Sequence, residues 1–300
     1  MAEGHRFGFV ALLGAPNAGK STLANALAGA KVSIVTHKVQ TTRSPVRAVF
    51  VEGGAQVVLV DTPGIFEPKR RLERAMVSAA WGQAGDVDIV AFLIDAKKGI
   101  GEEEDAVLQR LSEGPDTPKL LILNKVDLVP PETLLPLVKH ANGKVAFTET
   151  FMISALTHDG VEELRKGLAR LVPPGPWHFP EDHLSDLPLR LMAAEITREK
   201  LFLRLHQELP YQLTVETESW KQVRDGAVRI EQTVYVQRES QRKIVLGKRG
   251  QTIKAVGSEA RKEIAEIAEA PVHLFLFVKV RENWADDPER YGEMGLDFPR

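Results

Sequence analysis

The chain has 300 residues, a formal net charge of −2 and no cysteine. Apolar residues make up 43% of it and charged residues 27%, which is the balance of a globular protein rather than a disordered or fibrous one. The lack of cysteine excludes disulfides, zinc ribbons and thiol nucleophiles, and it fits a reducing compartment. Residues 1–8 lack the apolar core of a secretory signal, and no apolar run reaches the roughly 18 residues of a membrane span. We therefore expect a cytoplasmic protein with at most peripheral membrane contact.

Short apolar runs alternate with helical patterns over the first half of the chain. The runs predict strands at residues 9–13, 57–60, 89–94, 120–123 and 145–153, and amphipathic stretches predict helices at 20–28, 102–111 and 161–171. This βαβ rhythm predicts an α/β fold with a mostly parallel sheet covered by helices. Because such sheets bind ligands at the carboxyl ends of their strands, functional motifs should follow the apolar runs.

A phosphate-binding loop follows the first run and opens the first helix. Its residues are Gly14, Ala15, Pro16, Asn17, Ala18, Gly19, Lys20 and Ser21, and the hydroxyl residue that follows, Thr22, is included in the predicted site. The glycines let the backbone approach phosphate oxygens, and the loop N–H groups with the helix N-terminus form an anion site. The pattern predicts binding of a nucleoside triphosphate, with Lys20 at the β and γ phosphates and the Ser21 hydroxyl on Mg²⁺.

The motif after the second run predicts the rest of the metal site. Its residues are Asp61, Thr62, Pro63, Gly64 and Ile65. Asp61 is placed to hold Mg²⁺ through water, and the Gly64 N–H to contact the γ phosphate. Ile65 occupies the position at which Ras-type proteins carry the glutamine that orients the attacking water. Because Ile65 cannot hydrogen-bond, we expect slow intrinsic hydrolysis and assign no catalytic side chain.

A third motif identifies the base. Asn124, Lys125 and Asp127 follow the run at 120–123, where Asp127 can accept hydrogen bonds from guanine N1–H and the 2-amino group. Adenine offers neither donor, so it would leave the carboxylate unpaired. The alternative is a strand end with a helix cap at Asp127. Ser154, Ala155 and Leu156 follow the last run, where a backbone amide could reach guanine O6.

The second half of the chain has a different organisation. Prolines between residues 173 and 180 predict a linker, after which we expect a helix at 193–205, two strands, two helices and a closing strand. Between the two helices lies a Gly-x-x-Gly loop within a basic stretch. The residues expected to contact nucleic acid are Gly247, Lys248, Arg249, Gly250, Lys254, Arg242 and Lys243. Aromatic residues are few here, so we expect base reading through hydrogen bonds and aliphatic contacts. The alternative is an exposed basic hairpin that binds nothing.

In combination, these motifs resemble the Era family of bacterial GTPases over nearly the whole chain. The resemblance implies an α/β P-loop GTPase domain with a mostly parallel sheet, followed by an α+β type II KH domain. We expect these domains at residues 1–172 and 191–282, with a linker at 173–190 and an acidic tail at 283–300. It also implies that Gln40, Thr41, Thr42 and Arg43 form the first switch, with the Thr42 hydroxyl joining Mg²⁺ only when a γ phosphate is present.

The resemblance further implies a cycle between GTP and GDP with Mg²⁺. Asn17 is similar to the residue of GTPases that recruit K⁺ between the phosphates, which motivates a hypothesis of K⁺ activation. The implied partners are small-subunit ribosomal RNA near its 3′ end and the small ribosomal subunit, with a role in its assembly and no DNA. The implied location is the cytoplasm, partly at the inner face of the cell membrane.

Two other functions remain open from the sequence. The protein could be a non-enzymatic RNA chaperone or ribosome-docking module that uses GTP mainly as a structural ligand, and Ile65 gives this view some support. A nucleotide kinase is the weaker alternative, because Asp127 selects guanine and no lid is recognisable.

Overall fold

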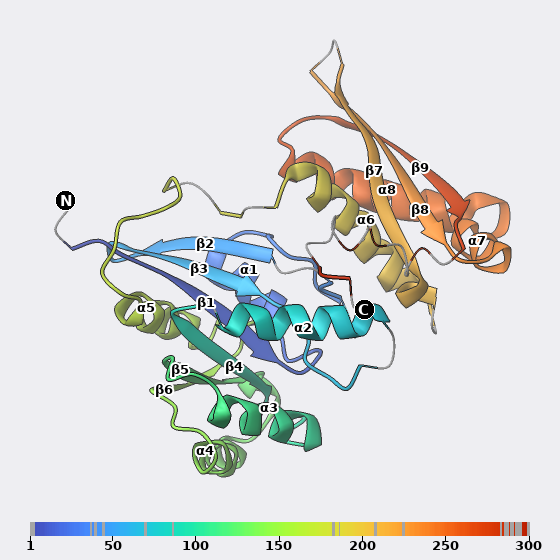
Figure 1. Cartoon of the computed structure of the whole chain (residues 1–300). Coiled ribbons are helices and arrows are strands. Elements are labelled where there is room, and N and C mark those ends of the chain that lie inside the picture. The colour runs from blue at the N-terminus through green and yellow to red at the C-terminus, as the bar shows by residue number, and fades with distance from the viewer. Residues whose placement is uncertain are drawn as a thin grey trace. The chain divides into compact units, whose positions relative to one another are not determined.

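The computed structural model describes residues 4–36, 38, 41–43, 46–68, 71–85, 87–181, 184–185, 187–206, 209–223, 226–282, 284, 288, 291 and 296–298. The chain divides into two compact units, which are described separately below (Figure 1). The first unit contains Met1–Ser33, Thr42–Asp186 and Met294–Arg300, and the second contains Ile34–Thr41 and Leu187–Glu293. Gln40 lies outside the described residues.

A six-stranded sheet in the order β2-β3-β1-β4-β5-β6 forms the centre of the first unit, within the described residues. All neighbouring strands are parallel except β2 and β3, which form an antiparallel pair. The strands are β1 (Arg6–Gly14), β2 (Val46–Glu52), β3 (Ala55–Asp61), β4 (Ile89–Asp95), β5 (Lys119–Asn124) and β6 (Glu149–Ile153). The mostly parallel sheet that the sequence predicts is confirmed.

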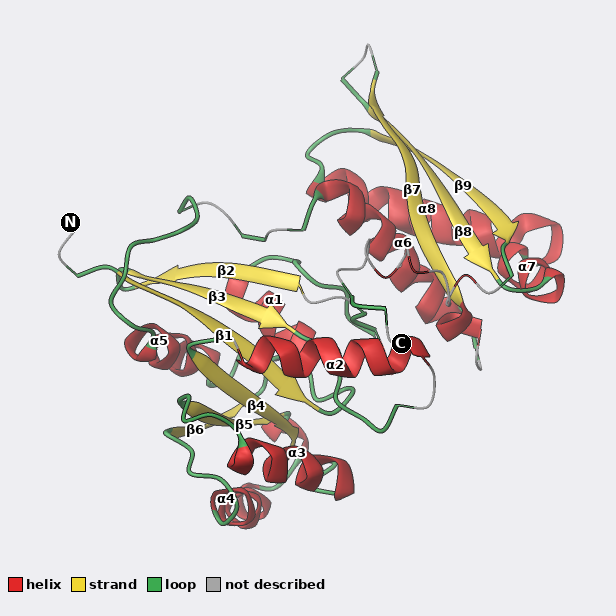
Figure 2. Ribbon diagram, viewed as in Figure 1, coloured by secondary structure: helices red, strands yellow, loops and turns green. Residues whose placement is uncertain are grey.

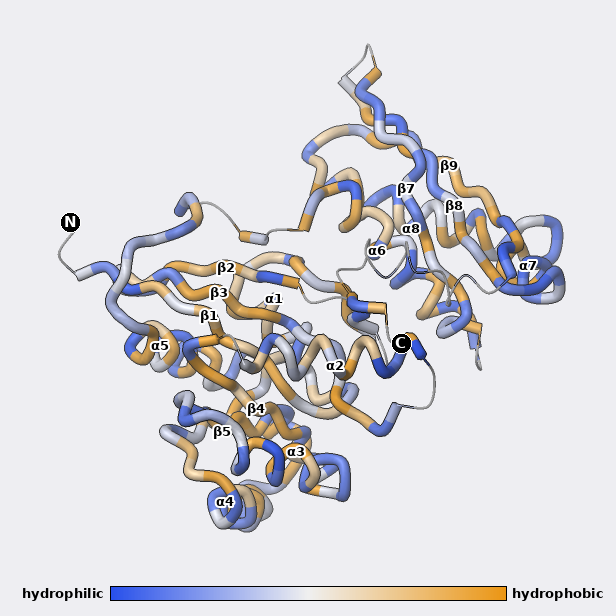
Figure 3. The backbone as a smooth tube through the Cα atoms, viewed as in Figure 1, coloured by the Kyte–Doolittle hydropathy of each residue, from blue (hydrophilic) through white to orange (hydrophobic). Residues whose placement is uncertain are grey.

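Helices cover both faces of this sheet, and each face has its own apolar core. Helices α1 (Lys20–Ala28) and α5 (Val161–Leu171) pack on one face. The other face is covered by α2 (Arg71–Gly85), α3 (Glu102–Glu113) and α4 (Leu134–Asn142). Because both faces are covered, β1 and β4 are hydrophobic along most of their length (Figure 3). Their carboxyl ends open at one edge of the sheet.

Most predicted elements of this unit agree with the structure, and the differences have physical reasons. The helices predicted at 20–28 and 161–171 have the predicted bounds. The strand predicted over 145–153 begins only at Glu149, because Val145 and Phe147 fill the core beside α4 from a loop. The sequence analysis missed β2, α2 and α4. Apolar burial alone therefore does not distinguish a strand from a buried loop.

Part of the predicted linker packs on the first unit. The Phe7 N–H donates to the Pro173 carbonyl at 3.0 Å, and the Val49 N–H donates to the Leu184 carbonyl at 2.9 Å. Between them, Gln56 bonds both the backbone N–H and the carbonyl of Phe179. This unit thus extends to Asp186, beyond the boundary predicted at residue 172. Backbone hydrogen bonds of this kind produce no side-chain pattern, so they cannot be predicted from a proline-rich sequence.

The second unit has helices on one face of a three-stranded sheet (Figure 2). Strands β7 (Leu213–Gln222) and β8 (Val228–Val236) are antiparallel, and β9 (Val272–Val280) lies parallel to β8. The helices are α6 (Leu189–Arg204), α7 (Glu239–Leu246) and α8 (Gln251–Ile267). The element order α-β-β-α-α-β is the one that the sequence predicts.

The predicted acidic tail is described only in part. Trp284 and Tyr291 are each 1% exposed, and the Trp284 indole N–H donates to the Gln212 carbonyl at 3.1 Å. The described residues of the segment therefore include buried aromatic anchors, which the count of acidic residues concealed. None of the helices in the described part of the chain has the length and apolar character needed to cross a bilayer.

Candidate nucleotide site and RNA-binding loop

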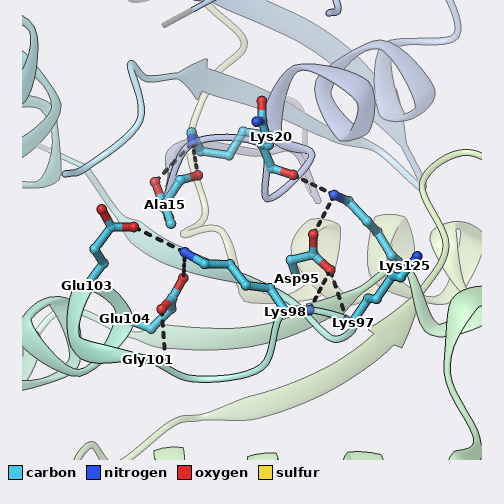
Figure 4. Close-up of polar contacts among 11 residues, drawn as sticks. Ala15, Lys20, Asp95, Lys97, Lys98, Gly101, Glu103, Glu104 and Lys125 are labelled. Atoms are coloured by element: carbon cyan, nitrogen blue, oxygen red, sulfur yellow. Dashed lines mark hydrogen bonds and ion pairs between the residues drawn. The ribbon is translucent and has the colours of Figure 1, made fainter. Parts of the chain in front are cut away.

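The phosphate-binding loop lies between β1 and α1, at the carboxyl end of the central strand. Lys20, the first residue of α1, is 6% exposed, and its ammonium donates to the Gly14 and Ala15 carbonyls at 3.0 Å each (Figure 4). Burial lowers the pKa of Lys20 to about 8, although the nearby Asp61 carboxylate opposes this shift. The loop and its lysine form a compact cationic turn, as the motif predicts.

Gly19 brings the loop against the base motif. Its φ of 99° is in the left-handed region, and a Cβ on it would lie 2.2 Å from Asn124 Nδ2. No other residue type fits there without moving Asn124, because two heavy atoms cannot approach so closely. The glycine therefore sets the distance between the phosphate loop and the base motif.

Four oxygen-bearing side chains gather beside Lys20. Ser21 Oγ lies 2.8 Å from Thr42 Oγ1, and Ser33 Oγ donates to Asp61 Oδ2 at 2.8 Å. Thr42 Oγ1 lies 3.5 Å from the same Asp61 oxygen. Burial raises the pKa of Asp61, and this shift is opposed by hydrogen bonds from Ser21, Ser33 and Thr42 and by the charge of Lys20. Ser21, Thr42 and Asp61, the three predicted metal residues, thus lie together.

The donor chemistry of this cluster fits Mg²⁺. Asp61 is fully buried, and its Oδ1 has no hydrogen-bond partner among the described residues. A buried carboxylate oxygen without a donor is costly unless a cation meets it. Mg²⁺ prefers hard oxygen ligands such as carboxylates and hydroxyls together with substrate phosphates. Ser33 was not predicted, because a lone serine in a loop carries no pattern.

Asn124 links three of the predicted motifs. It ends β5 and is 2% exposed, its Nδ2 donates to the Ala18 carbonyl at 2.8 Å, and its Oδ1 accepts the Ala155 N–H at 3.0 Å. The Ala155 amide is thereby engaged within the protein. The Leu156 side chain is 78% exposed.

Asp127 has the accessibility that a base-reading carboxylate needs. It lies in the short 3-10 helix η1 (Val126–Leu128), just beyond β5, and its side chain is exposed. Ser154 is buried, and its Oγ accepts the Thr157 N–H at 3.2 Å, which holds the third base motif in a turn. The structure therefore brings the guanine motifs and the phosphate loop to one edge of the sheet.

Lys125 connects the base motif with the phosphate loop. Its ammonium donates to the Asn17 carbonyl at 2.6 Å and to Asp95 Oδ2 at 2.6 Å (Figure 4). Lys125 has a φ of 66°, which is unusual for a residue with a side chain. The sequence analysis missed Asp95, although its position directly after the apolar run at 89–94 is the signal that could have found it.

Ile65 faces the protein interior. It is 7% exposed and packs in the core formed with α2, α3 and α4, while its N–H donates to the Gly14 carbonyl at 3.0 Å. Its side chain therefore has neither the chemistry nor the direction to orient water. Of the described residues that are predicted to form the first switch, Arg43 is buried and Thr42 contributes to the oxygen cluster.

The Gly-x-x-Gly loop of the second unit lies between α7 and α8. It contains a 3-10 turn, η4 (Lys248–Gly250). Gly247 has a φ of 72°, and a Cβ on it would lie 2.1 Å from Thr252 Oγ1. Glycine is required here because the backbone is left-handed and packs tightly on the first turn of α8.

The basic residues that were predicted to contact RNA differ in their exposure and in their contacts within the protein. Lys243, Lys248, Arg249 and Lys254 are exposed. Arg242 is half-buried, donates to the Val278 carbonyl at 3.1 Å and pairs with Glu239 at 3.0 Å, so it ties α7 to β9. Phe275 and Phe277 on β9 are 42% and 49% exposed, which adds aromatic surface that the sequence analysis did not assign.

Family models match both halves of the chain. A model described as a 50S ribosome-binding GTPase matches residues 9–125, and a KH domain model matches residues 208–285. The chain is 64% identical over 295 residues to GTPase Era of Bradyrhizobium sp. (strain ORS 278), covering 98% of this chain and 96% of that protein. It is 65% identical over 294 residues to GTPase Era of Brucella melitensis biotype 1, covering 98% and 94%.

Solved structures agree over the same extent. Era in complex with MgGDPNP and nucleotides 1506–1542 of 16S ribosomal RNA has a TM-score of 0.92 and 38% identity, covering 97% of this chain and 99% of that chain. A variant of Aquifex aeolicus Era bound to GDP and AlF4⁻ gives the same values. With the motifs assembled as described, the chain belongs to the Era family of GTPases, and its two domains are a P-loop GTPase domain and a KH domain.

Proposed function

We propose that this GTPase is a molecular switch that binds small-subunit ribosomal RNA near its 3′ end through the KH domain and assists assembly of the small subunit. Nucleotide binding is supported by the gathering of Lys20, Ser21, Thr42 and Asp61 at the sheet edge that also carries the predicted base motif. The solved relative with MgGDPNP and 16S ribosomal RNA bound supports both halves.

The phosphates of GTP are held by the loop from Gly14 to Ser21. Its N–H groups and the N-terminus of α1 stabilise the negative charge, and Lys20 exchanges its carbonyl partners for phosphate oxygens. Ser21, Thr42 and Asp61 would hold Mg²⁺, which when bound neutralises charge on the phosphates. By family resemblance, Thr42 would contact the metal only when a γ phosphate is present, so its segment would respond to the nucleotide state.

Guanine is read by Asp127 from the sheet edge, with Asn124 holding the surrounding loops and the Lys125 stem beside the base. Selectivity comes from pairing the carboxylate, because adenine has no donors for it. Hydrolysis is slow in the isolated protein, since Ile65 is buried in the core and no described side chain near the cluster acts as a general base. Backbone positioning, K⁺ beside Asn17 or an RNA partner completes the reaction.

Single-stranded RNA is held at the loop from Gly247 to Gly250. Close backbone approach to phosphates and the exposed charges of Lys248, Arg249 and Lys254 match the way a KH loop clamps about four nucleotides. This function places the protein in the cytoplasm. Contact with the inner face of the cell membrane stays a prediction from the family.

Coupling between the two activities is supported by the course of the first switch. Ile34–Thr41 clusters with the second unit, whereas Thr42 clusters with the first. The Val35 N–H donates to Glu199 of α6 at 2.8 Å. A change at Thr42 on loss of the γ phosphate is therefore transmitted along the chain to a segment associated with the KH domain.

Single-turnover hydrolysis with and without a small-subunit RNA fragment tests this proposal against the second candidate, an RNA-docking module with GTP as a structural ligand. The buried position of Ile65 is the observation that favours the module. Stimulation by RNA on the order of tenfold or more supports the switch. An unchanged rate with bound RNA favours the module.

A further inference from the structure

Asp95 belongs to neither the phosphate loop nor the base motif, yet it contacts a residue of the base motif. It is the last residue of β4 and lies opposite Asn124, the last residue of β5, in the parallel register. Its Oδ2 lies 2.6 Å from the Lys125 ammonium, which also donates to the Asn17 carbonyl at 2.6 Å (Figure 4). One ammonium thus joins β4, the base motif and the phosphate loop.

Backbone hydrogen bonds to the second oxygen of Asp95 hold its carboxylate in place. Oδ1 accepts the N–H of Lys97 at 2.9 Å and of Lys98 at 3.3 Å, so the turn after β4 holds the carboxylate in place. The Ala96 N–H donates to the Asn124 carbonyl at 2.9 Å and ties the same turn to β5. Lys125 is therefore bound to a preorganised anion rather than to a freely rotating side chain.

The neighbouring carboxylates have a different partner. Glu103 and Glu104 pair with the Lys98 ammonium at 3.1 and 3.0 Å, and Glu104 Oε2 also accepts the Gly101 N–H at 2.9 Å. The Lys125 side chain is 30% exposed and that of Asp95 is 17% exposed, so water screens their pair only in part. A hydrogen-bonded, partly buried ion pair is stronger than an exposed one.

We propose that Asp95 is a positioning residue for nucleotide retention. By fixing the Lys125 ammonium against the Asn17 carbonyl, it stabilises the left-handed backbone of Lys125 and makes the base loop and the phosphate loop move together. A nucleotide held at both ends then leaves only when both loops open. This inference rests on the proposed guanine site and extends it to a residue that touches no nucleotide.

A double-mutant cycle on the full chain tests this role. Asp95→Asn keeps an oxygen for the Lys97 and Lys98 N–H groups but removes the negative charge, whereas Lys125→Met keeps the stem and removes the ammonium. We expect Asp95→Asn to speed release of a fluorescent GDP analogue about tenfold in the otherwise native protein. In the Lys125→Met background it should change release less than about twofold, because coupled residues are not additive.

The outcomes separate positioning from a structural role. If Asp95→Asn leaves GDP release unchanged, or speeds it equally in both backgrounds, the proposal is overturned. Glu103→Gln is the matched control, because it removes an exposed carboxylate of the same region that does not contact Lys125, and it should not change release. If wild-type protein fails to bind GDP, the guanine site itself is wrong; if binding is normal and only the cycle fails, the role of Asp95 alone is wrong.

Discussion

The nucleotide site and the RNA-binding loop are built in opposite ways. At the nucleotide site, Lys20, Asp61 and Asn124 are buried and each has partners from other elements. At the Gly-x-x-Gly loop, Lys248 and Arg249 are exposed, and the tightly packed part is the backbone at Gly247. The difference follows from the ligands. A nucleotide enclosed by the protein is bound best by preorganised side chains, whereas the phosphates of a flexible RNA strand can be bound by exposed cations.

Removing one buried member of the nucleotide site should have the largest effect. We expect Lys20→Ala to weaken GTP binding about a hundredfold or more, because the phosphate loop loses the buried ammonium that faces its carbonyls. Titration with a fluorescent GTP analogue measures the loss. Thermal unfolding of the same variant without nucleotide is the control, and an affinity for GTP within a few fold of the wild type would contradict a preorganised site.

A substitution at Asp127 should change which nucleotide the site prefers rather than abolish nucleotide binding. Asp127→Asn replaces an acceptor with a side chain that also carries donors, so GDP affinity should fall about a hundredfold while affinity for XDP, whose base has a carbonyl at C2, should rise. Competition between the two nucleotides measures the exchange. Unchanged preference for GDP would mean that Asp127 does not face the base and acts only as a helix cap.

Potassium should affect turnover without affecting binding. If Asn17 helps to place K⁺ beside the phosphates, hydrolysis in potassium buffer should exceed that in sodium buffer by about tenfold, since the added charge acts where charge develops during reaction. Phosphate release in matched buffers provides the comparison. Equal rates reject the hypothesis of K⁺ activation and leave hydrolysis to the phosphate loop and the metal residues.

Single substitutions at the RNA-binding loop should have the smallest effect of the changes considered. Lys248→Ala and Arg249→Ala should each weaken RNA binding only a few fold, about 1 kcal/mol or less, and each should reduce the slope of log affinity against log salt by about one. Anisotropy titrations at several salt concentrations measure both quantities. Arg242→Ala is the contrasting variant, because Arg242 bonds Val278 and should lower thermal stability as well. A single change at Lys248 that abolishes binding would contradict a loop of independent cations.

The sequence predicted the elements whose residues carry a local pattern. The phosphate loop, the base motif and the Gly-x-x-Gly loop follow or precede periodic segments, so their places on strand ends and helix starts could be predicted. Ser33 could not be predicted, because it lies in a loop without a pattern and acts through Asp61, far along the chain. The position of Asp95 after the apolar run at 89–94 is a signal in the sequence, but its pairing with Lys125 could not be predicted from it. Their roles depend on the order of the strands in the sheet.

Elements without a pattern of their own were missed or misplaced for a related reason. The strand β2 is stabilised by its antiparallel pairing with β3, and the segment after Pro173 by backbone hydrogen bonds to the first unit. The buried Trp284 and Tyr291 lie in a stretch that composition alone marks as acidic. The conformation of such segments is determined by tertiary contacts rather than by local propensity.

We propose that the nucleotide state changes the affinity of the KH domain for RNA. A labelled RNA fragment from the 3′ end of small-subunit ribosomal RNA, titrated with protein loaded with a GTP analogue, with GDP or with no nucleotide, tests it most directly. We expect the RNA affinity with the GTP analogue to differ from that with GDP by about fivefold or more. Equal affinities in the three states would contradict the coupling and leave two independent binding domains.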